Sequence, residues 1–143
     1  MKPGLFCAVA LALLTFSARV YIPSRPQALA HPVQIVQPSI LWGHAFAESD
    51  FKPAPKHINP IDKGMFGLHE TAEIHAERAA KWGEYDALDP VQAWRIAAHI
   101  MAENLAAFDS LEMGITAYRW GQGGARLHGI DKIYMARVMR HGL

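Results

Sequence analysis

Residues 42–51 read WGHAFAESDF, an apolar run that ends at the acid Glu48 and is followed at once by a proline-rich segment. Pro38 can occupy the first position of a helix, and apolar residues recur at helical spacing from Ile40 onward. We therefore predict a helix over 38–49 with Glu48 in its last turn. Apolar neighbours disfavour the ionised form of a carboxyl group and raise its pKa toward the range of a useful proton donor. Glu48 is the candidate general acid.

Length and composition limit what this acid can belong to. The chain has 143 residues, enough for one domain, and 51% of them are hydrophobic, enough to bury a core. The formal net charge of +1 excludes a strongly basic nucleic-acid binder, so we expect no nucleic acid as a partner. The single cysteine, Cys7, excludes an internal disulfide framework and a cysteine-based zinc site. We expect a monomer.

The N-terminus is typical of a secretory signal peptide. Lys2 precedes a nearly unbroken apolar run over 5–16, which is too short for a membrane span of about 20 residues but suits the apolar part of an export signal. Cleavage is expected after Ser17 or after Ala30, and an uncleaved membrane anchor is the alternative. We therefore expect an exported protein of the periplasm or cell envelope.

A lead-in separates this signal from the domain. Four prolines between residues 19 and 38 remove backbone donors and push the residues before them out of the helical region. We therefore assign 1–30 to the signal peptide and lead-in, and 31–143 to a single domain.

Beyond a proline-rich loop over 52–63, the sequence predicts further helices. Counted with their capping residues, they cover 71–82, 89–108, 109–118 and 131–141. The apolar face of the second is expected to comprise Val91, Trp94, Ala98, Met101, Leu105 and Phe108. The glycines that should end the third are Gly121, Gly123 and Gly124. Because no stretch alternates with the period of a strand, we predict an all-α fold.

Four short motifs occur in a fixed order along residues 38–143. They are Glu48-Ser49 after an apolar helix, Gly64-Met65-Phe66-Gly67-Leu68 after the loop, Asp89-Pro90 at a helix start, and Ala117-Tyr118 before a glycine-rich turn. In order and approximate spacing the chain resembles the lytic transglycosylases of the soluble-lytic-transglycosylase type, relatives of goose-type lysozyme. The resemblance implies a lysozyme-like helical domain whose cleft binds the glycan strands of peptidoglycan.

The resemblance also implies a role for Glu48. The family's glutamate protonates the glycosidic oxygen between N-acetylmuramic acid and N-acetylglucosamine, then acts as base on the muramic 6-hydroxyl, giving a 1,6-anhydro product without water. One carboxyl group suffices, whereas ordinary glycosidases place two across the scissile bond. A lysozyme-type hydrolase would draw its second acid from Asp50, Asp62, Glu70 or Glu73. A catalytically inert peptidoglycan-binding scaffold is the alternative outside enzymes.

The same motifs supply the expected substrate contacts, which are Ser49, Met65, Phe66, Gly67, Tyr118, Arg119 and Trp120. Gly67 stands where the family usually has Gln, Arg119 where it has Asn, and Ala93 where an Asn commonly follows the Asp-Pro helix start. These departures affect substrate contacts more than the acid, and they are compatible with altered specificity or weak activity. The segment 64–68 has two interpretations, a backbone that approaches the ligand or a turn that plugs the core.

Three further patterns each have a structural and a functional interpretation. His69, Glu70 and His75 suggest a metal site, but histidines six apart lie on different helix faces, so we predict no metal and no cofactor. Tryptophans could stack on sugar rings: Trp94 fits the core better, and Trp120 is the better carbohydrate candidate. The basic residues of 119–143 are Arg119, Arg126, Lys132, Arg137 and Arg140. They form a solvated face or attract anionic wall polymers. Cell-envelope machinery, such as a secretion or motility apparatus, is a further partner that the sequence allows.

Overall fold

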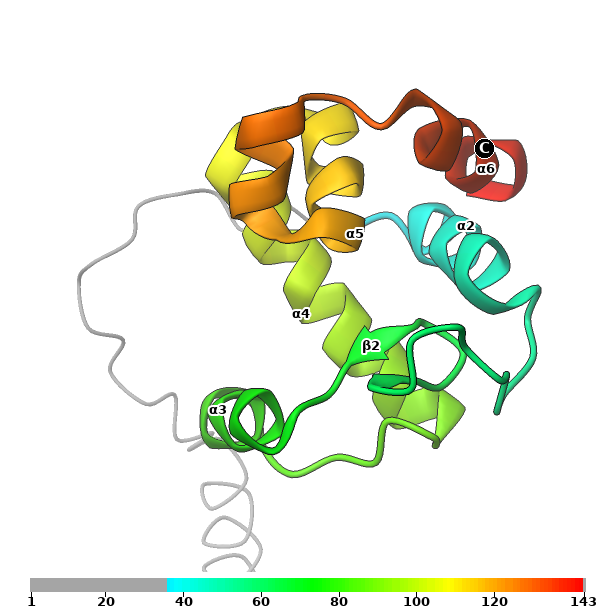
Figure 1. The fold of residues 1–143 in the computed structure, drawn as a ribbon, viewed down its shortest axis with the longest axis vertical. Helices are drawn as coiled ribbons and strands as arrows, with labels where there is room; N and C mark the ends of the chain where they lie inside the picture. The colour runs from blue at the N-terminus through cyan, green and yellow to red at the C-terminus, as the bar shows by residue number, and fades with distance from the viewer. Residues whose placement is uncertain (1–35, 143) are drawn as a thin grey trace, which may run out of the picture. The chain divides into compact units, whose positions relative to one another are not determined.

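The structure, a computed structural model, describes residues 36–142, so the expected signal peptide and its cleavage sites lie outside the described residues. The helices are α2 (Pro38–Ser49), α3 (Ala72–Trp82), α4 (Pro90–Phe108), α5 (Leu111–His128) and α6 (Lys132–Gly142). The strands β1 (Asp62–Lys63) and β2 (Leu68–His69) pair antiparallel (Figure 1). Helices dominate this part of the chain, which confirms the all-α prediction. None of the described helices is both long and apolar enough to cross a membrane.

The helices begin where the predicted caps stand. The side chain of Thr71 accepts a hydrogen bond from a backbone N–H of the first turn of α3, and Ser110 does the same for α5. Asp89 accepts from two such groups at the start of α4, and Pro90 follows it at the first helical position. Each cap satisfies backbone donors that a helix leaves without partners in its first turn. Local sequence therefore determines these helix starts.

Helix α4 forms the centre of the core. Its residues Ala93, Ile96, Ala97 and Met101 are fully buried, and α5 packs against its C-terminal half. The predicted apolar face included Val91, but this side chain is 79% exposed. Five of the six predicted positions carry bulky apolar side chains, and the prediction omits the buried alanines Ala93 and Ala97, whose small side chains allow neighbouring segments to approach closely. The buried face is therefore rotated toward Ala93 and Ala97.

Helices α2 and α6 lie side by side, although they are far apart in the sequence (Figure 1). Glycines make this close approach possible: a Cβ on Gly43 would lie 2.2 Å from the carbonyl oxygen of Val138, and one on Gly142 would lie 2.8 Å from that of Ser39. Any larger residue would force the two helices apart. This packing brings Tyr134 on α6 against α2 near Glu48.

Helix α5 is longer than predicted. The prediction that glycines end it at Tyr118 was wrong, since α5 continues to His128. Only Gly121 leaves the helical region, with φ 71° and ψ 165°, and the helix resumes after this kink. Buried Ala125 anchors the second part. Glycine can adopt helical as well as left-handed angles, so a glycine cluster alone does not decide between a kink and an end.

The hairpin of β1 and β2 was not predicted, because strands of two residues are too short to show an alternating pattern. Its turn uses positive φ angles at Gly64 (67°) and Gly67 (57°). The turn buries Phe66 and Leu68 in the core and leaves Gly67 beside α2. The hairpin thus serves as the core plug that the sequence allowed, and it also reaches the end of α2 where Glu48 lies.

Candidate active site

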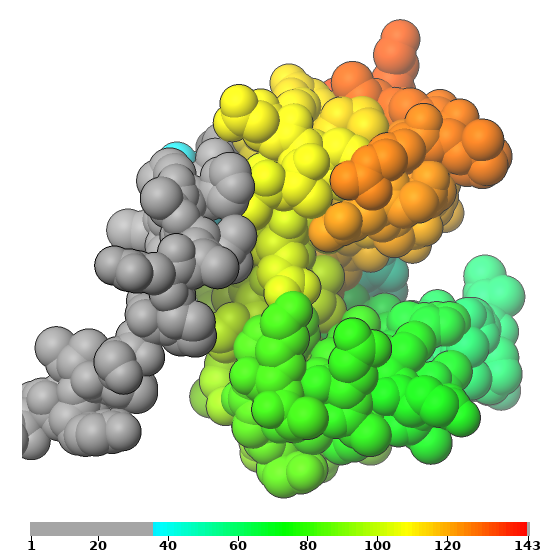
Figure 2. Space-filling view, turned by 90° about the vertical axis from the view of Figure 1, so that its left-hand side faces the viewer, coloured from blue at the N-terminus to red at the C-terminus, as the bar shows by residue number. Residues whose placement is uncertain are grey.

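An open groove of about 1160 Å³ runs across the domain and has Glu48 in its wall. Its lining comes from the end of α2, the loop after it, the β1–β2 hairpin, α3, α4, α5 and α6. Figure 2 shows this side of the molecule hollowed between α5 (orange) and the segment that includes β2 and α3 (green). The groove is open to solvent, so an extended ligand can lie along it.

Glu48 combines burial with access to the groove. Its Oε1 accepts a hydrogen bond from the hydroxyl of Tyr134 at 2.5 Å. Its Oε2 lies over Gly67, where a Cβ would be only 2.7 Å away. Burial raises the pKa of Glu48 above its ordinary value, and the bond from Tyr134 and the charge of Arg119 partly oppose this rise. No Lys, Arg or His of residues 36–142 forms a salt bridge with Glu48. Its carboxyl group can therefore hold a proton at the groove wall.

Tyr134 and His44 lie behind this carboxyl group. Tyr134 is 1% exposed, and its hydroxyl lies 2.9 Å from Nδ1 of fully buried His44. Burial lowers the pKa of His44 from 6.5 to about 3, so the imidazole is neutral at physiological pH. Sequence analysis assigned neither residue a role in the site. A tyrosine on the buried face of a helix needs a partner for its hydroxyl, and that requirement was the available signal for Tyr134.

Tyr118 lines the groove but does not hydrogen-bond to Glu48. Its hydroxyl donates to the backbone carbonyl of Phe66 at 3.1 Å, which ties α5 to the hairpin, and its ring packs 4.2 Å from that of His44. Met65 and Phe66 were predicted as substrate contacts, but their side chains are buried in the core and do not line the groove. Both belong to the hydrophobic core, where the ring of Phe66 packs edge to face on Trp94 of α4 with 5.7 Å between ring centres.

The other predicted contacts do border the groove. Ser49 lines it, although its hydroxyl donates back to the carbonyl of Ala45. Gly67 also lines it and supports Glu48 as described. The guanidinium of Arg119 lies 5.1 Å from the ring centre of Tyr134, and Trp120 is 40% exposed. The structure thus gathers five of the seven predicted substrate residues along the groove.

The other candidate acids and the two histidines do not form a single cluster with Glu48. Asp50 and Asp62 line the same groove, whereas Glu73 is exposed on α3. Glu70 accepts hydrogen bonds from Arg78, Tyr85 and His75 in a separate polar cluster. His69 pairs with Asp62, while His75 pairs with Glu70. The two histidines considered as metal ligands therefore engage different carboxylates.

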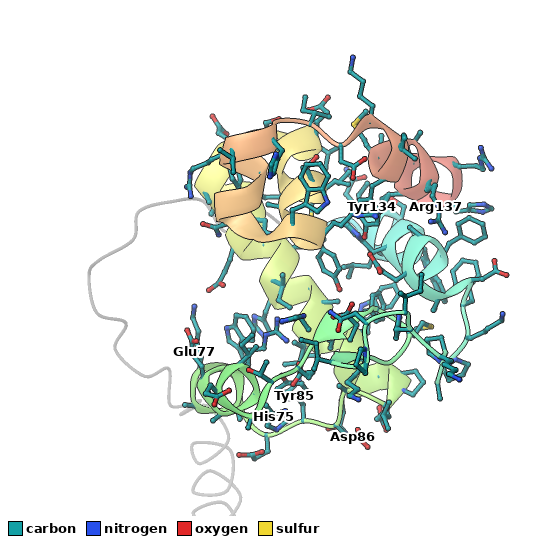
Figure 3. The ribbon with its side chains drawn as sticks, in the orientation of Figure 1. His75, Glu77, Tyr85, Asp86, Tyr134 and Arg137 are labelled. Atoms are coloured by element: carbon teal, nitrogen blue, oxygen red, sulfur yellow. The ribbon has the colours of Figure 1, made fainter. Side chains whose placement is uncertain are left out.

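Only some of the tryptophans and of the basic residues near the C-terminus line the groove. Trp42 and Trp94 pack edge to face at 5.1 Å, and neither lines the groove. Of the five basic residues in the tail, Arg119 and Arg137 line the groove. Arg137 projects from α6, the helix that also carries Tyr134 (Figure 3). Arg126 instead lies over the ring of Phe108. Lys52, Lys56 and Arg78 line the groove as well, so it carries positive side chains from the loop after α2, from α3, from α5 and from α6.

Comparison with known proteins identifies one family. The family model described as Transglycosylase SLT domain matches residues 32–129, which is more than half of the chain. The matched segment includes Glu48, Gly67 and Tyr118, and it ends before α6 and Tyr134. No curated protein and no solved structure matches the chain.

Proposed function

The chain belongs to the transglycosylase SLT domain family, and we propose that it is a lytic transglycosylase that cleaves the glycan strands of peptidoglycan with Glu48 as its acid and base. The observation that carries this proposal is the state of the Glu48 carboxyl group. Burial favours its protonated form, it borders an open groove, and one hydroxyl donor holds it in place. These are the properties that a general acid requires.

The acid step uses the oxygen of Glu48 that Tyr134 does not occupy. With Oε1 accepting from the tyrosine hydroxyl, the proton on Oε2 is available to the glycosidic oxygen between muramic acid and glucosamine. Its transfer accompanies cleavage of the bond between muramic C1 and that oxygen, and the glucosamine end leaves as an alcohol. The N-acetyl group of the muramic residue supports the positive charge that develops at C1.

The base step regenerates Glu48. The ionised carboxylate takes the proton of the muramic 6-hydroxyl while the 6-oxygen bonds to C1, which forms the 1,6-anhydro ring. One C–O bond is broken and one is formed, the proton returns to Glu48, and no water is consumed. Tyr134 and the positive charge of Arg119 stabilise the carboxylate between the two steps.

The surroundings of Glu48 suit an anionic carbohydrate. Trp120 presents 40% of its surface and borders the groove, so its indole can stack on a sugar ring. Arg119 and Arg137 border the same groove and can attract the carboxylates of the lactyl group or the stem peptide. Such a substrate places the protein in the periplasm or cell envelope, in keeping with the export signal expected in 1–30.

Digestion of purified sacculi tests the proposal. We expect soluble fragments that end in 1,6-anhydromuramic acid, lighter by one water than the hydrolytic product in mass spectrometry. Glu48→Gln should release none of them, although its helical circular dichroism is unchanged. Release of the same fragments by the folded Glu48→Gln variant would overturn the assignment of the acid.

A lysozyme-type hydrolase is the second candidate, because Asp62 borders the same groove and its charge adds to the rise in the pKa of Glu48. Fragments with reducing muramic ends would identify this activity, and their loss in Asp62→Asn would assign the second carboxylate. Binding of sacculi without any release of fragments would identify the inert scaffold instead.

A further inference from the structure

His44 is a buried titratable residue that the proposed reaction does not use. It lies one helical turn before Glu48 on the same face of α2 and is 0% exposed. Nδ1 meets the hydroxyl of Tyr134, while Nε2 has no hydrogen-bond partner within residues 36–142. A polar group in such a place costs stability, since burial of an unpaired nitrogen removes its hydration. Ala or Leu would fill an apolar helix position without this cost.

The hydrogen bonds around Tyr134 depend on which nitrogen of His44 carries the proton. A neutral imidazole has one N–H, and a tyrosine hydroxyl has one proton to donate. If Nδ1 is protonated, it donates to Tyr134, and the tyrosine proton goes to Oε1 of Glu48. If Nε2 is protonated, Nδ1 draws the tyrosine proton toward itself, and Glu48 loses its donor. The tautomer of His44 therefore decides whether Tyr134 donates to Glu48.

We propose that His44 is a positioning residue for the acid: its Nδ1–H donates to Tyr134, which directs the tyrosine proton to Oε1 of Glu48 and leaves Oε2 to carry the proton used in the reaction. This inference rests on the proposed function for the use of that proton. We call the chain of hydrogen bonds from His44 through Tyr134 to Glu48 the relay. Oε2 is the oxygen over Gly67 at the groove wall, so the relay places the reactive proton on the side of the carboxyl group toward the groove.

The packing around His44 keeps the relay in one geometry. The Tyr118 ring lies 4.2 Å from the imidazole, and the Tyr134 ring lies 5.8 Å from it on another side. Both tyrosines are neutral at physiological pH, because burial raises their pKa values well above 10.0. The groups that act on the titration of Glu48 from the surrounding elements are Tyr134 on α6, Arg119 on α5, His57 in the loop and Asp62 on β1.

The relay predicts the sign of one measurable shift. A donor to its oxygen polarises the Tyr134 hydroxyl and strengthens its bond to the Glu48 carboxylate. His44→Leu removes that donor, so the ionised carboxylate loses support and the pKa of Glu48 should rise by about 0.5 to 1. In the opposite tautomer, the same change would release the tyrosine proton to Glu48 and lower this pKa. The direction of the shift thus distinguishes the two arrangements.

Nuclear magnetic resonance of the full chain tests the tautomer directly. In protein labelled with ¹⁵N at histidine, we expect the proton of His44 on Nδ1 and an unprotonated Nε2 at about pH 7. A proton on Nε2 would overturn the proposal. This measurement needs neither a variant nor a substrate, so it stands even if the wild-type protein releases no fragments from sacculi, an outcome that would count against the proposed function alone.

The variants test the consequence for Glu48. The side-chain ¹³C signal of Glu48 should titrate at higher pH in His44→Leu than in wild type, and the corresponding limb of the kcat/KM profile should move with it. His44→Asn can present an amide N–H close to the position of Nδ1, and it should restore the wild-type titration. An unchanged or lowered pKa in folded His44→Leu, or a raised pKa in His44→Asn equal to that of the leucine variant, would overturn the relay.

Discussion

Glu48 and Glu70 are both withdrawn from water, but their partners differ. The Glu70 side chain is 7% exposed and lies 2.5 Å from the guanidinium of Arg78, with further hydrogen bonds from Tyr85 and His75. Its negative charge is balanced and fully hydrogen-bonded. Glu48 has one tyrosine hydroxyl and no salt-bridge partner within residues 36–142, so burial raises its pKa and favours the protonated form. The set of partners, more than burial itself, separates a carboxylate that holds structure from one that can donate a proton.

The two acids also serve different kinds of helix. Helix α2 has seven buried residues and is packed closely on α6, whereas α3 has none. The polar cluster of Glu70 attaches α3, since Arg78 and His75 lie on this helix and Tyr85 follows it (Figure 3). Because Arg78 also borders the groove, the cluster fixes one groove wall. Removing Glu48 should therefore change chemistry, and removing Glu70 should change stability.

The largest expected effect is the loss of activity in Glu48→Gln. A positioned general acid contributes about 100- to 10,000-fold to the rate, so the release of fragments from sacculi should fall by that factor. Glu70→Gln, assayed well below its unfolding temperature, should stay within about threefold of wild type, since its carboxylate contacts α3 and not the groove. Chromatography of released fragments measures both variants. Equal losses in the two folded variants would break the comparison.

The next effect is on stability. Glu70→Gln leaves the guanidinium of Arg78 without its ionic partner in a part-buried site, which should lower the free energy of unfolding by about 2 to 4 kcal/mol. Urea denaturation followed by circular dichroism measures this value. Glu73→Gln is the matched control, because Glu73 is an exposed acid in the first turn of α3 and its replacement should cost far less stability than that of Glu70. A loss in Glu73→Gln as large as in Glu70→Gln would refute the role of the cluster.

A smaller effect tests the close contact between Gly67 and the carboxyl group of Glu48. Gly67→Ala would place a Cβ 2.7 Å from Oε2 of Glu48, and the displaced carboxyl group should lower kcat/KM by about 10- to 100-fold. Gly129→Ala is the control for a positive φ without a steric clash, since Gly129 has φ 72° and no atom within 4 Å of a Cβ. Both variants should lose stability because alanine disfavours a positive φ, and only Gly67→Ala should lose activity. Equal activity would show that the contact with Gly67 is unimportant.

Sequence reasoning succeeded where the determinants are local. Thr71, Asp89 and Ser110 cap helices within a few residues of themselves, so their patterns could be recognised without tertiary information. Glu48 was placed at the end of an apolar helix by the same kind of pattern, and the family resemblance suggested its role. These predictions needed only the order of residues along one segment.

The rest depends on contacts between distant segments. Tyr134 is 86 residues from Glu48 along the chain, and His44 joins the site only because Gly43 and Gly142 let α2 and α6 approach. No local pattern reports such a pairing. Met65 and Phe66 show the opposite case, since a motif predicted them as substrate contacts, whereas the structure buries their side chains in the core. Gly67 was taken for a lost amide contact, yet the structure shows it making room for Glu48.

The smallest expected effect is the pH dependence of stability. The change in Tm relative to wild type should differ in sign between Glu48→Gln and Glu70→Gln. The folded-state pKa of Glu48 is raised above 4.5, so the native state keeps a proton that the unfolded chain releases as pH rises above this value. Stability therefore falls as pH increases from 4.5 through the folded-state pKa. Glu48→Gln has no such proton, and its Tm relative to wild type should rise across this window and then level off.

Glu70→Gln should instead have a lower Tm than wild type at about pH 8, because the charge it removes is paired with Arg78. Calorimetry from about pH 4 to pH 8 measures both differences, and a Tm for Glu48→Gln that falls relative to wild type as pH rises would mean that burial of Glu48 does not disfavour its ionised form.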